Sequence, residues 1–139
     1  MRGNRMKVKL FVIILGLIVA RTITAQSQVS LLEMDKAKEY LTLSADQYKT
    51  INTLVEQIKE VLEEDKTIIS NLKTRFKNGD EPGFFEKIKV KLARDSRVGK
   101  IDDLLDDIEN QLNDEQKAKF SKMNKPELKG LKKEEILRK

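Results

Sequence analysis

The chain has 139 residues, 37% of them charged, and a formal net charge of +5, with no cysteine and no histidine. These absences exclude disulfide bonds, metal sites built on thiolates or imidazoles, and catalytic pairs of a nucleophile with histidine. All of the excess charge lies in the first 25 residues, whereas the rest of the chain has 23 basic and 23 acidic residues. The basic pI is therefore no sign of a nucleic-acid partner, and none is expected.

Residues 1–25 have the pattern of a secretory signal peptide. Four basic residues precede the 11-residue apolar stretch Leu10–Ala20, and Ile23-Thr24-Ala25 forms a suitable cleavage site. The alternative is an uncleaved membrane anchor, but a spanning helix needs about 20 apolar residues, and Arg21 ends this run early. We therefore expect cleavage before Gln26, export, and no stable membrane insertion afterwards.

A short helix is predicted over residues 29–41 and a long one over residues 45–77. The apolar residues of the long helix follow helical spacing in two neighbouring rows, and Asp65 interrupts the main row. Such a wide apolar face is typical of a helical bundle, and the segment 78–83 predicts a turn. The main row is Tyr48, Ile51, Val55, Ile58, Leu62, Ile69, Leu72 and Phe76, with Leu54, Val61 and Ile68 beside it.

A return helix is predicted over residues 84–112. Gly99 lies in its polar middle stretch, so this helix either kinks there or breaks into two. A fourth helix is predicted over residues 114–124, followed by a flexible lysine-rich tail over residues 127–139. The apolar residues assigned to the return helix are Phe85, Ile88, Leu92, Ile101, Leu104, Leu105, Ile108 and Leu112.

The second and fourth helices begin with the same motif. Ser44 and Gln47 form a capping box, in which the serine hydroxyl accepts from the glutamine N–H and the glutamine side chain accepts from the serine N–H. Asn113 and Gln116 repeat this layout. Each copy begins with a leucine and has an acid before the glutamine. The motif residues are Leu43, Ser44, Asp46, Gln47, Leu112, Asn113, Glu115 and Gln116.

This pair resembles the LTxxQ motif that occurs twice per chain in the Spy/CpxP family of small periplasmic helical proteins. Ser44 and Asn113 stand where the family has threonine, and both are good N-cap residues. Spacing, length and helical pattern extend the resemblance over most of the chain after residue 30. The resemblance implies a periplasmic location and antiparallel dimers shaped as a shallow cradle. Some relatives bind zinc, but this chain lacks the histidine or cysteine for that role.

An antiparallel hairpin of the two long helices would bring the two motifs together. Folding about residues 80–81 places position 47 opposite position 114, at the open end of the hairpin. Each motif would begin a helix and turn the chain there, while Leu43 and Leu112 pack against each other. This is a structural role, which is the usual one for a helix cap.

The same fold places position 65 opposite position 96, so that two polar interruptions meet in the middle of the hairpin. The acidic stretch 63–65 would then pair with Arg94 and Arg97. Exposed pairs of this kind contribute only about 0–1 kcal/mol each. We therefore expect the polar middle to determine register and flexibility more than stability.

A single hairpin cannot cover both apolar rows of the long helix over their full length, and a second chain would supply the missing cover. The sequence thus predicts an all-α protein, a long antiparallel helical hairpin with short flanking helices, with its folded domain over residues 26–126. We expect this domain to form a homodimer, for which the family resemblance implies the cradle shape.

Candidate binding residues lie in the most basic stretch, residues 66–100, which carries a net charge of +6. There, exposed phenylalanines beside basic side chains could attract acidic or partly unfolded proteins. The ordinary alternative is that the lysines and arginines only solvate the helix and pair with acids four residues away. The candidates are Phe84, Phe85, Lys87, Lys91, Arg94 and Arg97.

Four aspartates occupy one face of the return helix and have the oxygen ligands that Ca²⁺ or Mg²⁺ prefers. A solvated acidic face is the simpler explanation, so no metal site is predicted. No cofactor and no enzymatic activity are expected, because the sequence has no nucleophile elbow, no phosphate-binding glycine loop and no carboxylate pair in an apolar pocket pattern. The aspartates are Asp102, Asp103, Asp106 and Asp107.

Two functions are consistent with these features. The first, which the family resemblance implies, is an ATP-independent periplasmic chaperone-like protein that binds unfolded or aggregation-prone clients during envelope stress. The second is a regulatory or structural protein of the cell envelope that binds one specific partner, such as a stress sensor. A specific site would favour clustered Trp, Tyr and Arg, and the chain has no tryptophan.

Overall fold

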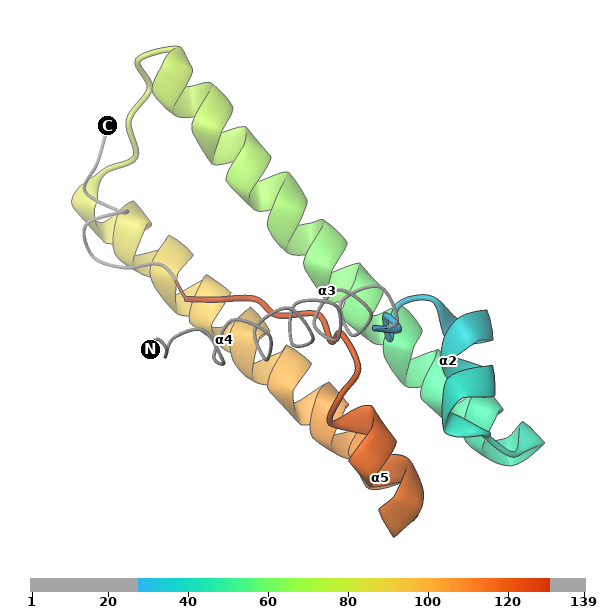
Figure 1. The fold of residues 1–139 in the computed structure, drawn as a ribbon. Helices are drawn as coiled ribbons and strands as arrows, with labels where there is room; N and C mark the ends of the chain where they lie inside the picture. The colour runs from blue at the N-terminus through green and yellow to red at the C-terminus, as the bar shows by residue number, and fades with distance from the viewer. Residues whose placement is uncertain (1–27, 131–139) are drawn as a thin grey trace, which may run out of the picture.

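The computed structural model describes residues 28–130, and within that range every regular element is a helix. The helices are α2 (Met34–Leu41), α3 (Ala45–Lys77), α4 (Phe84–Glu109) and α5 (Asp114–Phe120). α3 and α4 form a long antiparallel hairpin, and α2 and α5 lie at its open end (Figure 1). The all-helical hairpin predicted from the sequence is therefore confirmed. The predicted signal peptide and most of the predicted tail lie outside the described residues.

α3 begins and ends at the predicted residues because both ends carry local signals. At its start, Ser44 Oγ accepts from the Gln47 N–H at 3.1 Å, and Gln47 Oε1 accepts from the Ser44 N–H at 3.0 Å. Just past its end, Gly79 has a φ of 79°, a conformation that glycine adopts without strain. α4 is one continuous helix through Gly99 and does not break into two there.

The first and fourth helices are shorter than predicted, because the chain before α2 pairs with the chain after α5. The Leu31 N–H donates to Asn124 O at 2.9 Å, and the Asn124 N–H donates to Val29 O at 2.8 Å. These residues use their backbone groups between segments and not within a helix. α2 therefore starts only at Met34, and α5 stops at Phe120.

The apolar core lies in the half of the hairpin nearest its open end. Asp65 marks its limit on α3 and Arg97 marks its limit on α4. We call residues 66–93, beyond this limit, the distal half. Apolar side chains of α3 in the distal half, such as Leu72, are only half-buried. The largest fully buried side chains are Leu31, Leu41, Ile51, Val55, Ile58, Ile101 and Ile108.

Most of the stabilisation of the fold comes from the open end of the hairpin, because the buried side chains are concentrated there. Full burial of an aliphatic side chain contributes about 1.5–3 kcal/mol, and every side chain in the largest fully buried set lies outside the distal half. The distal half therefore depends more on polar contacts and on whatever covers its half-buried side chains.

α3 is 33 residues long, but charged residues recur along its whole length. A bilayer span requires about 20 predominantly apolar residues. Across the part of the chain that the structure describes, none of the helices combines the length and apolar character needed to cross a membrane.

Candidate functional site

The two motifs meet at the open end of the hairpin, as predicted from pairing the residue positions of the two long helices. Gln47 Nε2 donates to Gln116 Oε1 at 2.9 Å, and Gln116 Nε2 donates to Gln47 Oε1 at 3.1 Å. Each glutamine oxygen thus closes its own capping box and also accepts from the other glutamine. We call this pair of side chains, with its backbone partners, the motif junction.

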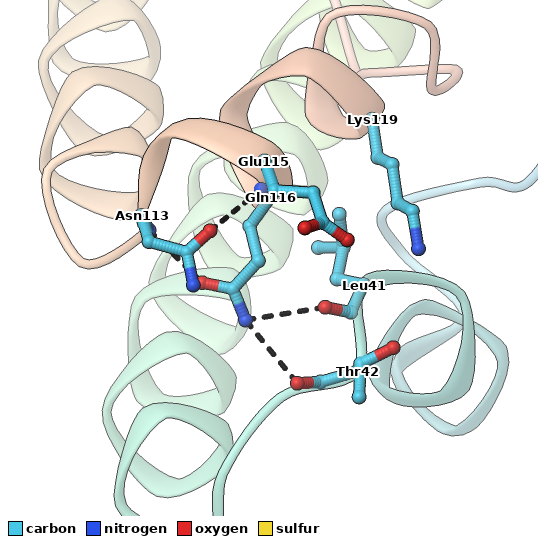
Figure 2. Close-up of a pocket in the computed structure, with 6 residues that line it drawn as sticks. All are labelled: Leu41, Thr42, Asn113, Glu115, Gln116 and Lys119. Atoms are coloured by element: carbon cyan, nitrogen blue, oxygen red, sulfur yellow. Dashed lines mark hydrogen bonds between the residues drawn. The ribbon is translucent and has the colours of Figure 1, made fainter.

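The remaining amide protons of the motif junction hold backbone carbonyls. Gln47 Nε2 donates to Gln111 O at 2.8 Å, and Gln116 Nε2 donates to Leu41 O at 3.1 Å and to Thr42 O at 3.2 Å. Figure 2 shows Gln116 reaching from α5 across to the turn that follows α2. The two glutamines therefore link the end of α2, the start of α3, the turn that follows α4, and the start of α5.

A hollow of about 180 Å³ lies beside the motif junction. In Figure 2 the Asn113 and Gln116 side chains face one another, whereas Lys119 extends away from them. The polar atoms of Gln116 are already engaged by protein partners, so the junction fixes helices and offers little to a ligand. The lining residues are Leu41, Thr42, Asn113, Glu115, Gln116 and Lys119.

The other motif residues divide by burial. Leu43 and Leu112 are buried members of the same core cluster. Asp46 and Glu115 are exposed and lie in the first turns of α3 and α5. A carboxylate there interacts favourably with the positive end of the helix dipole. All eight motif residues thus have a structural explanation.

The middle of the hairpin contains a buried ionic cluster, which we call the Asp65 cluster. Asp65 Oδ1 accepts from Arg97 Nε at 3.0 Å and from Arg97 Nη2 at 2.8 Å, while Asp65 Oδ2 accepts from Arg94 Nη1 at 3.0 Å. The predicted pairing across the hairpin is confirmed for Asp65. The expectation that these pairs would be exposed is wrong, because Asp65 is 5% and Arg97 7% exposed. The neighbouring Glu63 and Glu64 are exposed.

The most exposed apolar side chains lie on α4 in the distal half. Phe84 is 66% exposed, Phe85 78%, Ile88 39% and Leu92 61%. The two phenylalanine rings contact each other edge to face, with centroids 5.6 Å apart. These four residues share one side of α4, and we call them the apolar patch.

Sequence reasoning missed that Ile88 and Leu92 belong to the apolar patch, because it assigned them to the packing face of the return helix. The helical spacing does carry the signal. Ile101 follows Leu92 by nine positions, and nine steps of about 100° place the two on opposite sides of a helix. Ile101 is fully buried, so Leu92 must face away from α3.

The basic candidates differ in how free they are. Arg94 and Arg97 belong to the Asp65 cluster and contribute to the fold. Lys87 Nζ lies 2.6 Å from Glu81 and is largely covered, whereas Lys91 Nζ lies 2.8 Å from Asp95 and is about 40% exposed. Phe84, Phe85 and the exposed lysines thus remain as candidates for contact with a partner.

The turn of the hairpin is held by another ion bridge. Arg75 Nε donates to Asp80 Oδ2 at 2.8 Å, and the same guanidinium also donates to both carboxylate oxygens of Glu86. These hydrogen bonds from Arg75 lower the pKa of Asp80 and of Glu86 below the usual carboxyl range. The bridge ties the end of α3 to the first turn of α4.

The aspartate cluster of α4 lies on the surface. Asp102, Asp103, Asp106 and Asp107 are all exposed. Over residues 28–130, no group of three or more His, Cys, Asp or Glu side chains is arranged to hold a metal ion. A solvated acidic face accounts for the four aspartates.

None of the family models, curated proteins or solved structures compared with the chain matches it. The resemblance to the Spy/CpxP family therefore rests on the paired capping boxes and on the helical pattern.

Proposed function

We propose that this chain is an exported, ATP-independent chaperone-like protein of the Spy/CpxP type, which binds unfolded or aggregation-prone clients in the periplasm. The observation that carries this proposal is the apolar patch of α4, where four large side chains are exposed outside the core. Contiguous exposed apolar side chains on a soluble domain mark a surface that contacts a partner.

The charge around the apolar patch suits loosely specified binding. Residues 66–100 carry a net charge of +6, and Lys89 and Lys91 follow the two phenylalanines on α4. A field of one sign attracts acidic segments over long range, and apolar contacts then hold them without a shaped pocket. Such a surface favours many weak clients over one specific partner, since a specific hot spot is usually a desolvated pocket with aromatic and arginine anchors.

The two halves of the hairpin support different tasks in this proposal. The motif junction and the core hold the open end, so the distal half can leave apolar surface exposed without loss of the fold. A second copy of the chain would cover the half-buried side chains of α3 in the distal half and form the homodimer. The four α3 side chains concerned are Ile68, Ile69, Leu72 and Phe76.

The test uses the chain that begins at Gln26 and an unrelated protein that unfolds in dilute buffer. Light scattering reports aggregation of the client with and without a stoichiometric amount of the helical protein. We expect suppression that weakens at high salt, because salt screens the attraction between exposed charges. The double variant Phe84→Ser/Phe85→Ser should lose most of the suppression.

The matched control is Ala45→Ser/Ala118→Ser, which also places two serines at exposed helical positions but far from the apolar patch. It should suppress aggregation as the parent chain does. If the well-folded parent chain suppresses no aggregation, the general chaperone is excluded, and a regulatory or structural protein with one specific envelope partner is the better explanation. Equal activity of both double variants would show that clients bind elsewhere.

A further inference from the structure

After α5 the chain turns back and runs along α4 towards the turn of the hairpin (Figure 1). Its path is fixed at two points. Asn124 pairs with the segment before α2 through Val29 and Leu31. Further on, Arg94 Nε donates to Lys129 O at 2.7 Å. This segment therefore runs antiparallel to α4 and heads for the start of that helix.

Arg94 connects this returning segment to the Asp65 cluster. Its Nη1 donates to Asp65 while its Nε donates to Lys129 O, so one guanidinium holds both α3 and the returning chain. Gly130 then lies directly against Asp95, where an added Cβ would be 2.8 Å from Asp95 Oδ1. The described chain thus ends in close contact with α4, one turn from Leu92 of the apolar patch.

Residues 131–139 have the length and the side chains to reach the apolar patch. Asp95 and Phe84 are eleven positions apart, which is about 16 Å along a helix. Nine further residues span up to about 30 Å when extended, so they are long enough to reach Phe84 at the far end of the patch. They include three large aliphatic residues, Leu131, Ile136 and Leu137, and two acids, Glu134 and Glu135, that complement nearby lysines of α4.

We propose that residues 131–139 dock on the apolar patch of their own chain, with Leu131, Ile136 and Leu137 against Ile88, Leu92 and the two phenylalanines. A tether that starts one turn from its target has a high effective concentration there, which favours this occupant over a second copy of the chain. Docking stands on the geometry alone. Its consequence, that a client must displace the docked segment, rests on the proposed function.

The absence of cysteine from the chain makes a direct test possible. A spin label on Lys139→Cys should broaden the backbone NMR signals of Phe84, Ile88 and Leu92, because the docked segment brings the label close to them. The matched control is the same label on Ser121→Cys, which lies just after α5 at the other end of α4. It should leave those signals sharp.

A second pair of variants tests which side chains dock. Ile136→Ser/Leu137→Ser should abolish the broadening caused by the label on Lys139→Cys, whereas Lys132→Ser/Lys133→Ser should preserve it. Equal broadening of the Phe84, Ile88 and Leu92 signals by the labels at positions 139 and 121 would overturn the proposal. Broadening that appears only between a spin-labelled chain and a separate isotope-labelled chain would also overturn it, since the occupant would then be a second copy.

Client binding separates this proposal from the proposed function. If the segment is docked nine-tenths of the time, its removal by Ile136→Ser/Leu137→Ser should tighten the Kd for an unfolded client by about tenfold. Docking with no client binding by either variant would support the inference and exclude the chaperone. If clients bind through Phe84 and Phe85 but the label on Lys139→Cys broadens no signal of the apolar patch, the chaperone is supported and docking is excluded.

Discussion

Arg97 donates two hydrogen bonds to one carboxylate oxygen of Asp65, and both side chains are buried in the middle of the hairpin. Arg94 occupies the other oxygen of the same carboxylate. One acid therefore carries two guanidiniums at the point where the apolar core ends. This cluster separates a half of the hairpin that is closed by its own core from a half that leaves apolar side chains exposed.

Removal of the shared acid should strongly destabilise the fold. Asp65→Ala leaves Arg97 buried without its partner, and breaking a buried ion pair in this way costs about 3–5 kcal/mol. Urea unfolding followed by helical circular dichroism measures the change. Glu64→Ala removes an exposed acid one residue earlier and should change the free energy of unfolding by less than about 0.5 kcal/mol. Similar values for the two variants would show that the Asp65 cluster contributes nothing particular.

The motif junction should depend on the glutamine amide and not on side-chain volume. Gln116→Met keeps the approximate size but removes the donor to the carbonyls of Leu41 and Thr42 and the acceptor of the Asn113 N–H. Each buried polar group left unpaired costs about 1–3 kcal/mol, so we expect a loss of about 2–4 kcal/mol in the free energy of unfolding.

The control for the motif junction is Glu115→Gln, which changes the exposed neighbour on the same turn of α5. Its effect should stay below about 1 kcal/mol, the usual size of a helix-dipole contribution. An equal, small loss from both variants would mean that the helices are joined by the surrounding leucines, and that the glutamines serve only as local caps.

The ion bridge at the turn should respond to acid. Because hydrogen bonds from Arg75 lower the pKa of Asp80 and Glu86 in the folded state, the bridge is fully formed above the usual carboxyl range and is lost as the pH falls through the lowered values. NMR titration of the side-chain carboxyl carbons should give midpoints below the usual range. Arg75→Gln should return both to ordinary values, whereas Lys77→Gln should not. Midpoints that ignore Arg75→Gln would contradict the bridge.

The elements that the sequence predicted well are those determined by local chemistry. The prediction of both ends of α3 is confirmed. Ser44 and Gln47 form their hydrogen bonds within one turn, and Gly79 ends the helix through its own backbone conformation. The meeting of the two motifs followed from the length of the hairpin. These features need no knowledge of distant residues.

The features that the sequence did not predict depend on contacts between distant segments. The helix before Leu41 was expected to start near residue 29, but Leu31 pairs with Asn124 across the molecule. The hydrogen bonds between the Gln47 and Gln116 side chains cannot be predicted from either capping box alone, because each box is recognised only from residues within one turn. Asp65 is buried beside Arg94, whose guanidinium also donates to Lys129 O of the returning chain.

The proposed homodimer should depend on the half-buried α3 side chains of the distal half. Leu72 follows Asp65 by seven residues, which places both on the same side of α3, yet Leu72 is only half-buried in the hairpin. We expect sedimentation velocity at micromolar concentrations to show a dimer, and Leu72→Glu to convert it to a monomer, because a charge buried in an apolar interface without a partner is strongly unfavourable. Lys73→Glu changes the exposed neighbour and should leave the dimer intact. If the parent chain sediments as a monomer, the proposal that a second chain covers these side chains is contradicted. The distal half would then be held by the ion bridge at Arg75 and by contacts within its own chain.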